Sequence, residues 1–107
     1  TLEHDLRLAI DQQQFALHYQ PIVDLNSRQV VGFEALMRWQ HPARGFVSPA
    51  DFIPVAEETG LILAISRWVL EAACAQLASW QQRFSAAQTL RVSVNLSGKD
   101  LLQTTLV

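Results

Sequence analysis

The sequence has little cysteine, little charge and no long uncharged apolar run. Its single cysteine, Cys74, excludes an internal disulfide and a cysteine-built zinc site. Cys74 lies in an alanine-rich helical stretch, where we expect a small buried side chain. No run of about 18 uncharged apolar residues occurs, so we expect no membrane insertion by this segment. Half of the residues are hydrophobic and only 17% are charged, which excludes intrinsic disorder.

Basic residues are too few for nonspecific binding along a nucleic-acid duplex. Lys and Arg total 8, Asp and Glu total 10, and the formal net charge is −2. A protein that binds duplexes nonspecifically carries a surplus of positive charge, so we expect no duplex partner. This charge balance does not exclude the binding of a small phosphorylated ligand. With 107 residues, the chain is one domain or part of one.

Hydrophobic periodicity predicts a helix followed by a β-hairpin. Apolar residues recur at helical spacing over residues 2–12, and the period changes to two from Phe15 to Val23. A polar turn over residues 24–28 separates this strand from a second strand over residues 29–39. A connection this short favours antiparallel pairing, because parallel strands need a crossover of a dozen or more residues. Residues 40–47 are predicted to form a loop.

The remainder of the chain is predicted to complete a βαβ unit. Ser48 followed by proline predicts a helix start, and Gly60 predicts its end. A long helix follows over residues 61–84, and a third strand over residues 90–96. The route from the second strand through helices to the third predicts parallel pairing of these strands. The next helix is predicted to open over residues 97–103.

Alternation along the second and third strands separates an apolar face from a polar one. The polar face of the second strand carries Glu34, Leu36 and Arg38, and that of the third carries Ser93 and Asn95. Helices cover both faces of an open parallel sheet, so its strands lack a persistent polar face. The pattern therefore favours the interior of a barrel, where residues near the carboxyl ends of strands line the active site.

Glu34, Arg38 and Asn95 have the chemistry to bind a metal ion and a phosphate group. Carboxylate and amide oxygens suit Mg²⁺ or Mn²⁺, and a guanidinium suits a phosphate oxygen. Spacing alone favours a simpler interpretation, a buried ion pair between Glu34 and Arg38 with a structural hydrogen-bonding role for Asn95. The residue pattern leaves both interpretations open.

The string Glu34-Ala35-Leu36-Met37-Arg38-Trp39 resembles the signature of the EAL domain, the family of bacterial cyclic di-GMP-specific phosphodiesterases. Further blocks that resemble the family follow the same order along the whole chain: Tyr19–Val23, His41-Pro42, Phe52–Glu57, Gly60–Ile62, Trp68–Leu70 and Val94–Ser97. The resemblance implies an α/β fold, a TIM-like barrel whose first strand is antiparallel. Residues 1–107 would be the amino-terminal part of a single EAL phosphodiesterase domain, because such a barrel needs about 250 residues.

The resemblance also implies residue roles in the hydrolysis of cyclic di-GMP to linear pGpG. Glu34 would be catalytic and, with Asn95, a ligand of Mg²⁺ or Mn²⁺. Gln20, Leu36 and Arg38 would bind the substrate. The family's later acidic and lysine positions have no counterpart before Val107. We therefore expect the two-metal site to be completed by residues outside this chain, and the 107-residue piece itself to be inactive.

For the parent protein, the resemblance implies a cytoplasmic homodimer with upstream sensor or diguanylate-cyclase-like domains. An alternative is a noncatalytic cyclic di-GMP receptor or interaction module that signals to a partner domain. A third interpretation is an unrelated barrel enzyme in which Glu34 and Arg38 form an ion pair. Because Glu34 is intact within its motif, the sequence favours an enzyme over a receptor.

Overall fold

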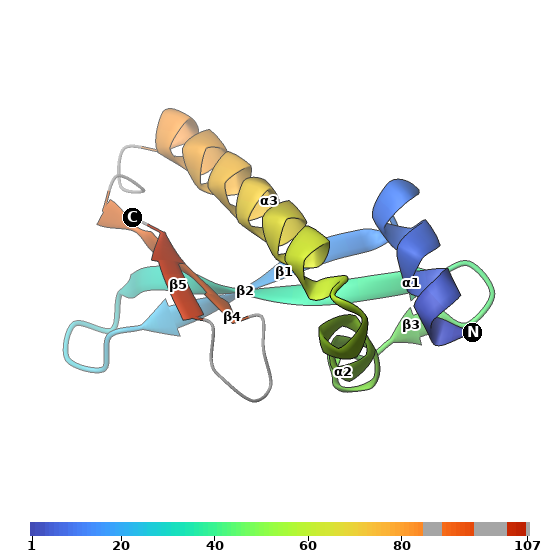
Figure 1. Ribbon diagram of the computed structural model, residues 1–107. Helices are drawn as coiled ribbons and strands as arrows, with labels where there is room; N and C mark the ends of the chain where they lie inside the picture. Colours follow the sequence, from blue (N-terminus) through green and yellow to red (C-terminus); the bar gives the residue numbers. More distant parts are fainter. Residues whose placement is uncertain (85–88, 96–102, 107) are drawn as a thin grey trace.

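The computed structural model describes residues 1–84, 89–95 and 103–106, which form a mixed sheet with helices packed against it (Figure 1). The sheet has five strands in the order β1-β2-β4-β5, with β3 paired to β2. In chain order, the elements are α1 (Leu2–Asp11), β1 (Phe15–Val23), β2 (Val30–His41), β3 (Gly45–Val47), α2 (Pro49–Thr59), α3 (Ile62–Arg83), β4 (Arg91–Asn95) and β5 (Gln103–Leu106).

Strand β2 occupies the centre of the sheet and pairs with strands on both sides. It runs antiparallel to β1, with Glu34 opposite Gln20. It runs parallel to β4, with Glu34 opposite Ser93. Both the hairpin and the parallel βαβ pairing predicted from the sequence are confirmed.

The two helices between β2 and β4 begin and end where the sequence predicts. The Ser48 hydroxyl accepts a hydrogen bond from the backbone N–H of Ala50 at 3.3 Å, and proline occupies the first turn of α2. Gly60 ends α2 with a φ of 79°, a left-handed conformation that glycine adopts without steric cost. Helix α3 then crosses one face of the sheet (Figure 1).

The core fills the space between that face of the sheet and the helices. Trp39 and Phe52 are completely buried, and their rings meet edge to face at 5.5 Å. Phe15 packs against both Trp39 and Trp68, at 5.9 and 5.7 Å between ring centroids. The Trp39 indole N–H donates to Gln14 Oε1 at 3.1 Å, which satisfies its polar atom inside the core. The predicted apolar face of β2 is confirmed from Ala35 to Trp39.

The predicted loop over residues 40–47 is wrong. Strand β2 continues to His41, and β3 returns antiparallel to it with Trp39 opposite Val47. Gly45 makes this tight reversal feasible, because it adopts a φ of 73°. The polar, glycine-containing stretch is therefore the turn of a short hairpin.

Two further expectations are also corrected. Gln103, predicted to lie at a helix start, belongs to β5 and pairs with Asn95 of β4. The β-branched residues Thr104 and Thr105 follow it and suit an extended strand. Residues 97–102 lie outside the described residues. Cys74 is exposed, because the buried stripe of α3 passes through Ala73 and the helix turns its neighbour outward.

Within the described residues, α3 is the one helix whose length and apolar composition would allow it to cross a membrane. Ile65, Val69, Ala73 and Leu77 form a buried stripe along it and belong to the core cluster. A core helix has the same length and composition. The expectation that this segment does not insert into a membrane stays a prediction.

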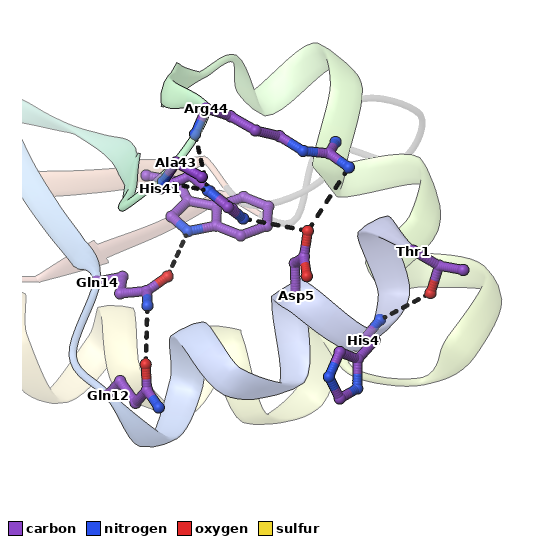
Figure 2. A network of polar contacts seen from close by, with 9 residues as sticks. Thr1, His4, Asp5, Gln12, Gln14, His41, Ala43 and Arg44 are labelled. Atoms are coloured by element: carbon purple, nitrogen blue, oxygen red, sulfur yellow. Dashed lines mark hydrogen bonds and ion pairs between the residues drawn. The ribbon is translucent and has the colours of Figure 1, made fainter.

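A polar network ties α1 to the far end of β2 (Figure 2). His41 Nδ1 accepts hydrogen bonds from the backbone N–H groups of Ala43 and Arg44, both at 3.0 Å. These two bonds leave the ring proton on Nε2, which donates to Asp5 Oδ2 at 3.1 Å. The Arg44 guanidinium lies 3.6 Å from the same oxygen. The helix, the strand end and the turn are therefore held together at one carboxylate.

The surroundings of Asp5 predict a loss of stability in acid. Partial desolvation raises the pKa of Asp5, but the hydrogen bond from His41 and the positive charges of the amino terminus and of Arg44 outweigh it. The pKa therefore lies below its ordinary value of 3.8. A lowered carboxyl pKa stabilises the fold once the group is ionised, and the contribution is lost as the pH falls through that pKa.

Asp5→Asn should therefore lower the free energy of unfolding at neutral pH. The difference from the wild type should begin to shrink as the pH falls toward 3.8 and should vanish once the pH lies below the lowered pKa of Asp5. Urea unfolding of both proteins across this pH range measures the difference. A difference that does not change with pH would show that the ionised carboxylate contributes nothing.

Gly32 marks a close approach between β2 and β4. A Cβ at this position would lie 2.6 Å from the Arg91 carbonyl oxygen, so Gly32→Ala must push the two backbones apart. We expect a loss of roughly 1–3 kcal/mol in the free energy of unfolding, measured with urea. The exposed neighbour Val31 is the control, because Val31→Ala should cost about 0.5 kcal/mol or less. Equal effects of the two substitutions would contradict the close approach.

Candidate functional site

The candidate site is the polar face of β2 and the strands beside it. This face carries three half-buried side chains of β2, which are Glu34, Leu36 and Arg38. Glu34 lies between Gln20 on β1 and Ser93 on β4, its direct neighbours across the sheet. Because directly opposed residues point to the same face of a sheet, these three side chains form one polar row.

Asn95 is the last residue of β4 and follows Ser93 by two residues. Alternation along a strand is the sequence argument that assigns it to the same face as Ser93. The pairing of β2 with β4 extends to Ala35 opposite Val94. The backbone of Asn95 comes one residue after this pair. Its side chain lies outside the described part of the structure. The backbone nevertheless brings Glu34 and Asn95 to neighbouring strands, as the sequence predicts.

Glu34 and Arg38 form no ion pair with each other. Four residues of extended strand separate their Cα atoms by about 13 Å. The Arg38 guanidinium instead donates from Nη1 to the Met37 carbonyl oxygen at 3.0 Å, and it lies over the Phe46 ring at 5.7 Å. The ion-pair interpretation that spacing alone favours is therefore wrong.

The Glu34 carboxylate makes no ion pair or hydrogen bond to any side chain in the part of the chain that the structure describes. A half-buried charge without a partner is costly, so such a group commonly serves a ligand. The oxygen atoms of Glu34 and of the neighbouring Gln20 and Ser93 are hard donors, which Mg²⁺ and Mn²⁺ prefer. The residues that are present therefore fit a divalent ion.

One carboxylate does not make a complete metal site. Among residues 1–84, 89–95 and 103–106, no group of three or more His, Cys, Asp and Glu side chains lies close enough to hold a metal ion. His4 and His18 are exposed, and His41 is bound to Asp5. The prediction that further ligands come from outside this chain stays open.

The sequence missed one contact at this site, between Arg38 and Phe46. The error follows from treating residues 40–47 as a loop, which left Phe46 without a strand or a face. The available signal was Phe46 itself, an apolar residue that directly follows an Arg-Gly pair in the turn after Trp39. Leu36 and Arg38 lie on the face that the sequence assigns to them, and Gln20 lies opposite Glu34.

Two relatives named as cyclic di-GMP phosphodiesterases match this chain over most of its length. It is 46% identical over 96 residues to the bifunctional diguanylate cyclase/cyclic di-GMP phosphodiesterase MucR of Pseudomonas aeruginosa, covering 90% of this chain and 14% of MucR. It is 41% identical over 105 residues to the cyclic di-GMP phosphodiesterase PdeR of Escherichia coli, covering 98% of this chain and 15% of PdeR. The chain thus spans a small part of each relative.

Solved structures match the fold of the described residues. The MucR phosphodiesterase in complex with cyclic di-GMP matches with a TM-score of 0.82 and 46% identity, covering 90% of this chain and 38% of that structure. The EAL domain of FimX from Pseudomonas aeruginosa, bound to cyclic di-GMP, matches with a TM-score of 0.72 and 30% identity, covering 90% and 36%. These matches confirm the predicted fold class.

Because Glu34 has no partner in the described residues, Glu34→Gln should leave stability nearly unchanged. We expect a shift of less than about 0.5 kcal/mol in the free energy of unfolding, measured with urea on the full-length protein without metal. A loss of about 3–5 kcal/mol, typical of breaking a buried ion pair, would mean that Glu34 is a structural residue.

The whole-chain comparison agrees with the strand-by-strand geometry. The family model of the EAL domain matches residues 3–107. The match includes the antiparallel first strand, the parallel β2–β4 pair and the polar row that contains Glu34. This chain belongs to the EAL domain family.

Proposed function

We propose that the EAL domain to which this chain contributes hydrolyses cyclic di-GMP to linear pGpG. The observation that carries the proposal is the unpartnered, half-buried Glu34 carboxylate, which lies between Gln20 and Ser93 on the polar face of the sheet. The similarity to MucR and PdeR, which are named cyclic di-GMP phosphodiesterases, supports the same reaction.

In this proposal, Glu34 and Asn95 hold a divalent ion, Mg²⁺ or Mn²⁺, together with ligands outside this chain. When bound, such ions activate a water molecule and stabilise negative charge that develops on a phosphate. Glu34 supplies a charged oxygen from the centre of the sheet. Asn95 lies on the adjacent strand and supplies an amide oxygen. Both are anchored by strand pairing, which suits a site whose ligands must hold a fixed geometry.

Arg38, Leu36 and Gln20 bind the dinucleotide in this proposal. The Arg38 guanidinium carries several N–H donors beyond the one bound to Met37, and these can bind a phosphate oxygen. Leu36 offers an apolar surface between the charged positions, and Gln20 offers an exposed amide beside Glu34. The Cα atoms of Glu34 and Arg38 lie about 13 Å apart along the strand, and this separation suits a substrate of dinucleotide size.

The reaction opens one phosphodiester bond of the cyclic dinucleotide. A water oxygen forms a new bond to phosphorus, and the bond from phosphorus to one bridging sugar oxygen breaks. The released sugar oxygen receives a proton, so the product is linear and carries a terminal phosphate. Arg38 holds the phosphate by charge-assisted hydrogen bonds during this exchange.

The parent protein is proposed to be a cytoplasmic homodimer with upstream sensor or diguanylate-cyclase-like domains. The bifunctional name of MucR supports additional domains, because this chain covers only 14% of that protein. A cytoplasmic location suits a substrate that is a guanine-nucleotide second messenger. The net charge of −2 gives no reason to propose a duplex nucleic-acid partner.

In the full-length protein, Glu34→Gln should abolish the hydrolysis of cyclic di-GMP, because it removes the charged oxygen while keeping the shape of the side chain. Chromatographic measurement of pGpG release with Mg²⁺ and with Mn²⁺ tests this. We expect turnover to fall by a factor of at least about 100, as for other metal-site residues. Glu71→Gln is the control, because Glu71 is exposed on α3 and should leave the rate unchanged.

Turnover by Glu34→Gln at the wild-type rate would contradict the proposed role of Glu34. Binding of cyclic di-GMP by the wild type without turnover, with either metal, would instead favour the receptor alternative. Isothermal titration calorimetry on the same samples separates these two results.

A further inference from the structure

Phe46 is a large apolar side chain at the rim of the candidate site. It lies on β3 directly opposite Gln40 of β2. Gln40 and Arg38 are two residues apart in one strand, so Phe46 shares a sheet face with Arg38. Phe46 is 53% exposed, although an aromatic ring gains most from burial. Packing in the core therefore does not explain the position of Phe46.

The contacts of Arg38 supply that reason. Its guanidinium carbon lies 5.7 Å from the centre of the Phe46 ring, within the range of a cation–π interaction. Its Nη1 donates to the Met37 carbonyl oxygen at 3.0 Å. An arginine side chain has many rotamers, and each contact removes some of them. A ring on one strand and a carbonyl on another together restrict where the guanidinium lies.

We propose that Phe46 is a positioning residue, which holds the Arg38 guanidinium in place to receive a phosphate of the bound dinucleotide. The ring makes no hydrogen bond to the guanidinium, so the remaining N–H groups stay available to an anion. The short β3 hairpin thereby contributes to substrate binding through Arg38. This proposal deepens the proposed function and rests on it for the substrate, but not for the contact itself.

The chain contains a matched control for this contact. The Arg83 guanidinium carbon lies 5.4 Å from the centre of the Phe84 ring. Phe84 is also 53% exposed. This second pair lies at the carboxyl end of α3, far from β3 in the fold (Figure 1). Phe84→Leu therefore removes an equivalent surface contact away from the candidate site.

The test compares Phe46→Leu with Phe84→Leu in the full-length protein. For Phe46→Leu, we expect the KM for cyclic di-GMP to rise about two- to fivefold, the range that an exposed cation–π contact supports. We expect kcat to change less than twofold, because the group acts on binding. Phe46→Tyr should restore the wild-type KM, since it keeps the ring. Phe84→Leu should leave KM and kcat unchanged.

A merely structural role for Phe46 makes a different prediction. A partly unfolded enzyme loses active molecules, so the apparent kcat falls while KM stays constant. A double-mutant cycle completes the test, because Phe46→Leu should have no further effect on KM in an Arg38→Ala background. An unchanged KM for Phe46→Leu would overturn the proposal. So would a rise in KM that persists in the Arg38→Ala background.

A measurement that needs no substrate separates this proposal from the proposed function. The ¹⁵N relaxation of the Arg38 Nε–H group reports how tightly the guanidinium is held on the nanosecond timescale. Its order parameter should fall in Phe46→Leu and stay unchanged in Phe84→Leu. That result supports the positioning contact even in a protein that does not hydrolyse cyclic di-GMP. An unchanged order parameter in Phe46→Leu would overturn the contact whatever the enzyme does.

Discussion

The pairing of β2 with a strand on each side is the constraint on which the rest of the structure depends. β1 fixes one edge of β2 through an antiparallel register, and β4 fixes the other through a parallel one. Because side chains alternate along a strand, a slip of one residue would exchange the two faces. The register therefore sends Trp39 into the core and Glu34 onto the polar face at the same time. Core packing and the candidate site are consequences of one alignment.

The carboxyl end of β2 is secured separately, by contacts from the beginning of the chain. The backbone N–H of Gln40 donates to the Gln14 carbonyl oxygen at 3.0 Å, and the Trp39 indole donates to the Gln14 side chain at 3.1 Å. His41 binds Asp5 of α1. Arg38 thus lies just before a segment that α1, β1 and β3 all hold. A site on such a strand can keep the fixed geometry that binding requires.

The sequence predicted the parts of the fold that depend on local pattern. Alternation along β2 placed Glu34, Leu36 and Arg38 on one face, and the short turn before β2 predicted the antiparallel hairpin. Ser48 and Gly60 predicted the ends of α2, since caps are read from a few neighbouring residues. The motif around Glu34 added a family resemblance that the comparisons confirm.

The errors over the strands have a common cause, which is that pairing between strands is not local. β3 has three residues, too few for a periodic signal, and it forms only because β2 extends to meet it. Gln103 looked like part of a helix start, yet β4 supplies a strand edge that it pairs with. Cys74 is one position away from the buried stripe of α3, an offset that composition does not reveal. The contact of Arg38 with Phe46 was missed because it depends on the pairing of β2 with β3.

The central claim is that the polar face of β2 binds cyclic di-GMP through a divalent ion. A structure of the full-length protein with cyclic di-GMP and Mg²⁺ or Mn²⁺ tests it most directly. The account predicts a Glu34 carboxylate oxygen and the Asn95 amide oxygen at about 2.0–2.3 Å from the ion. It also predicts the Arg38 guanidinium within hydrogen-bond distance of a substrate phosphate. A dinucleotide bound elsewhere, or an ion held without Glu34, would contradict the account.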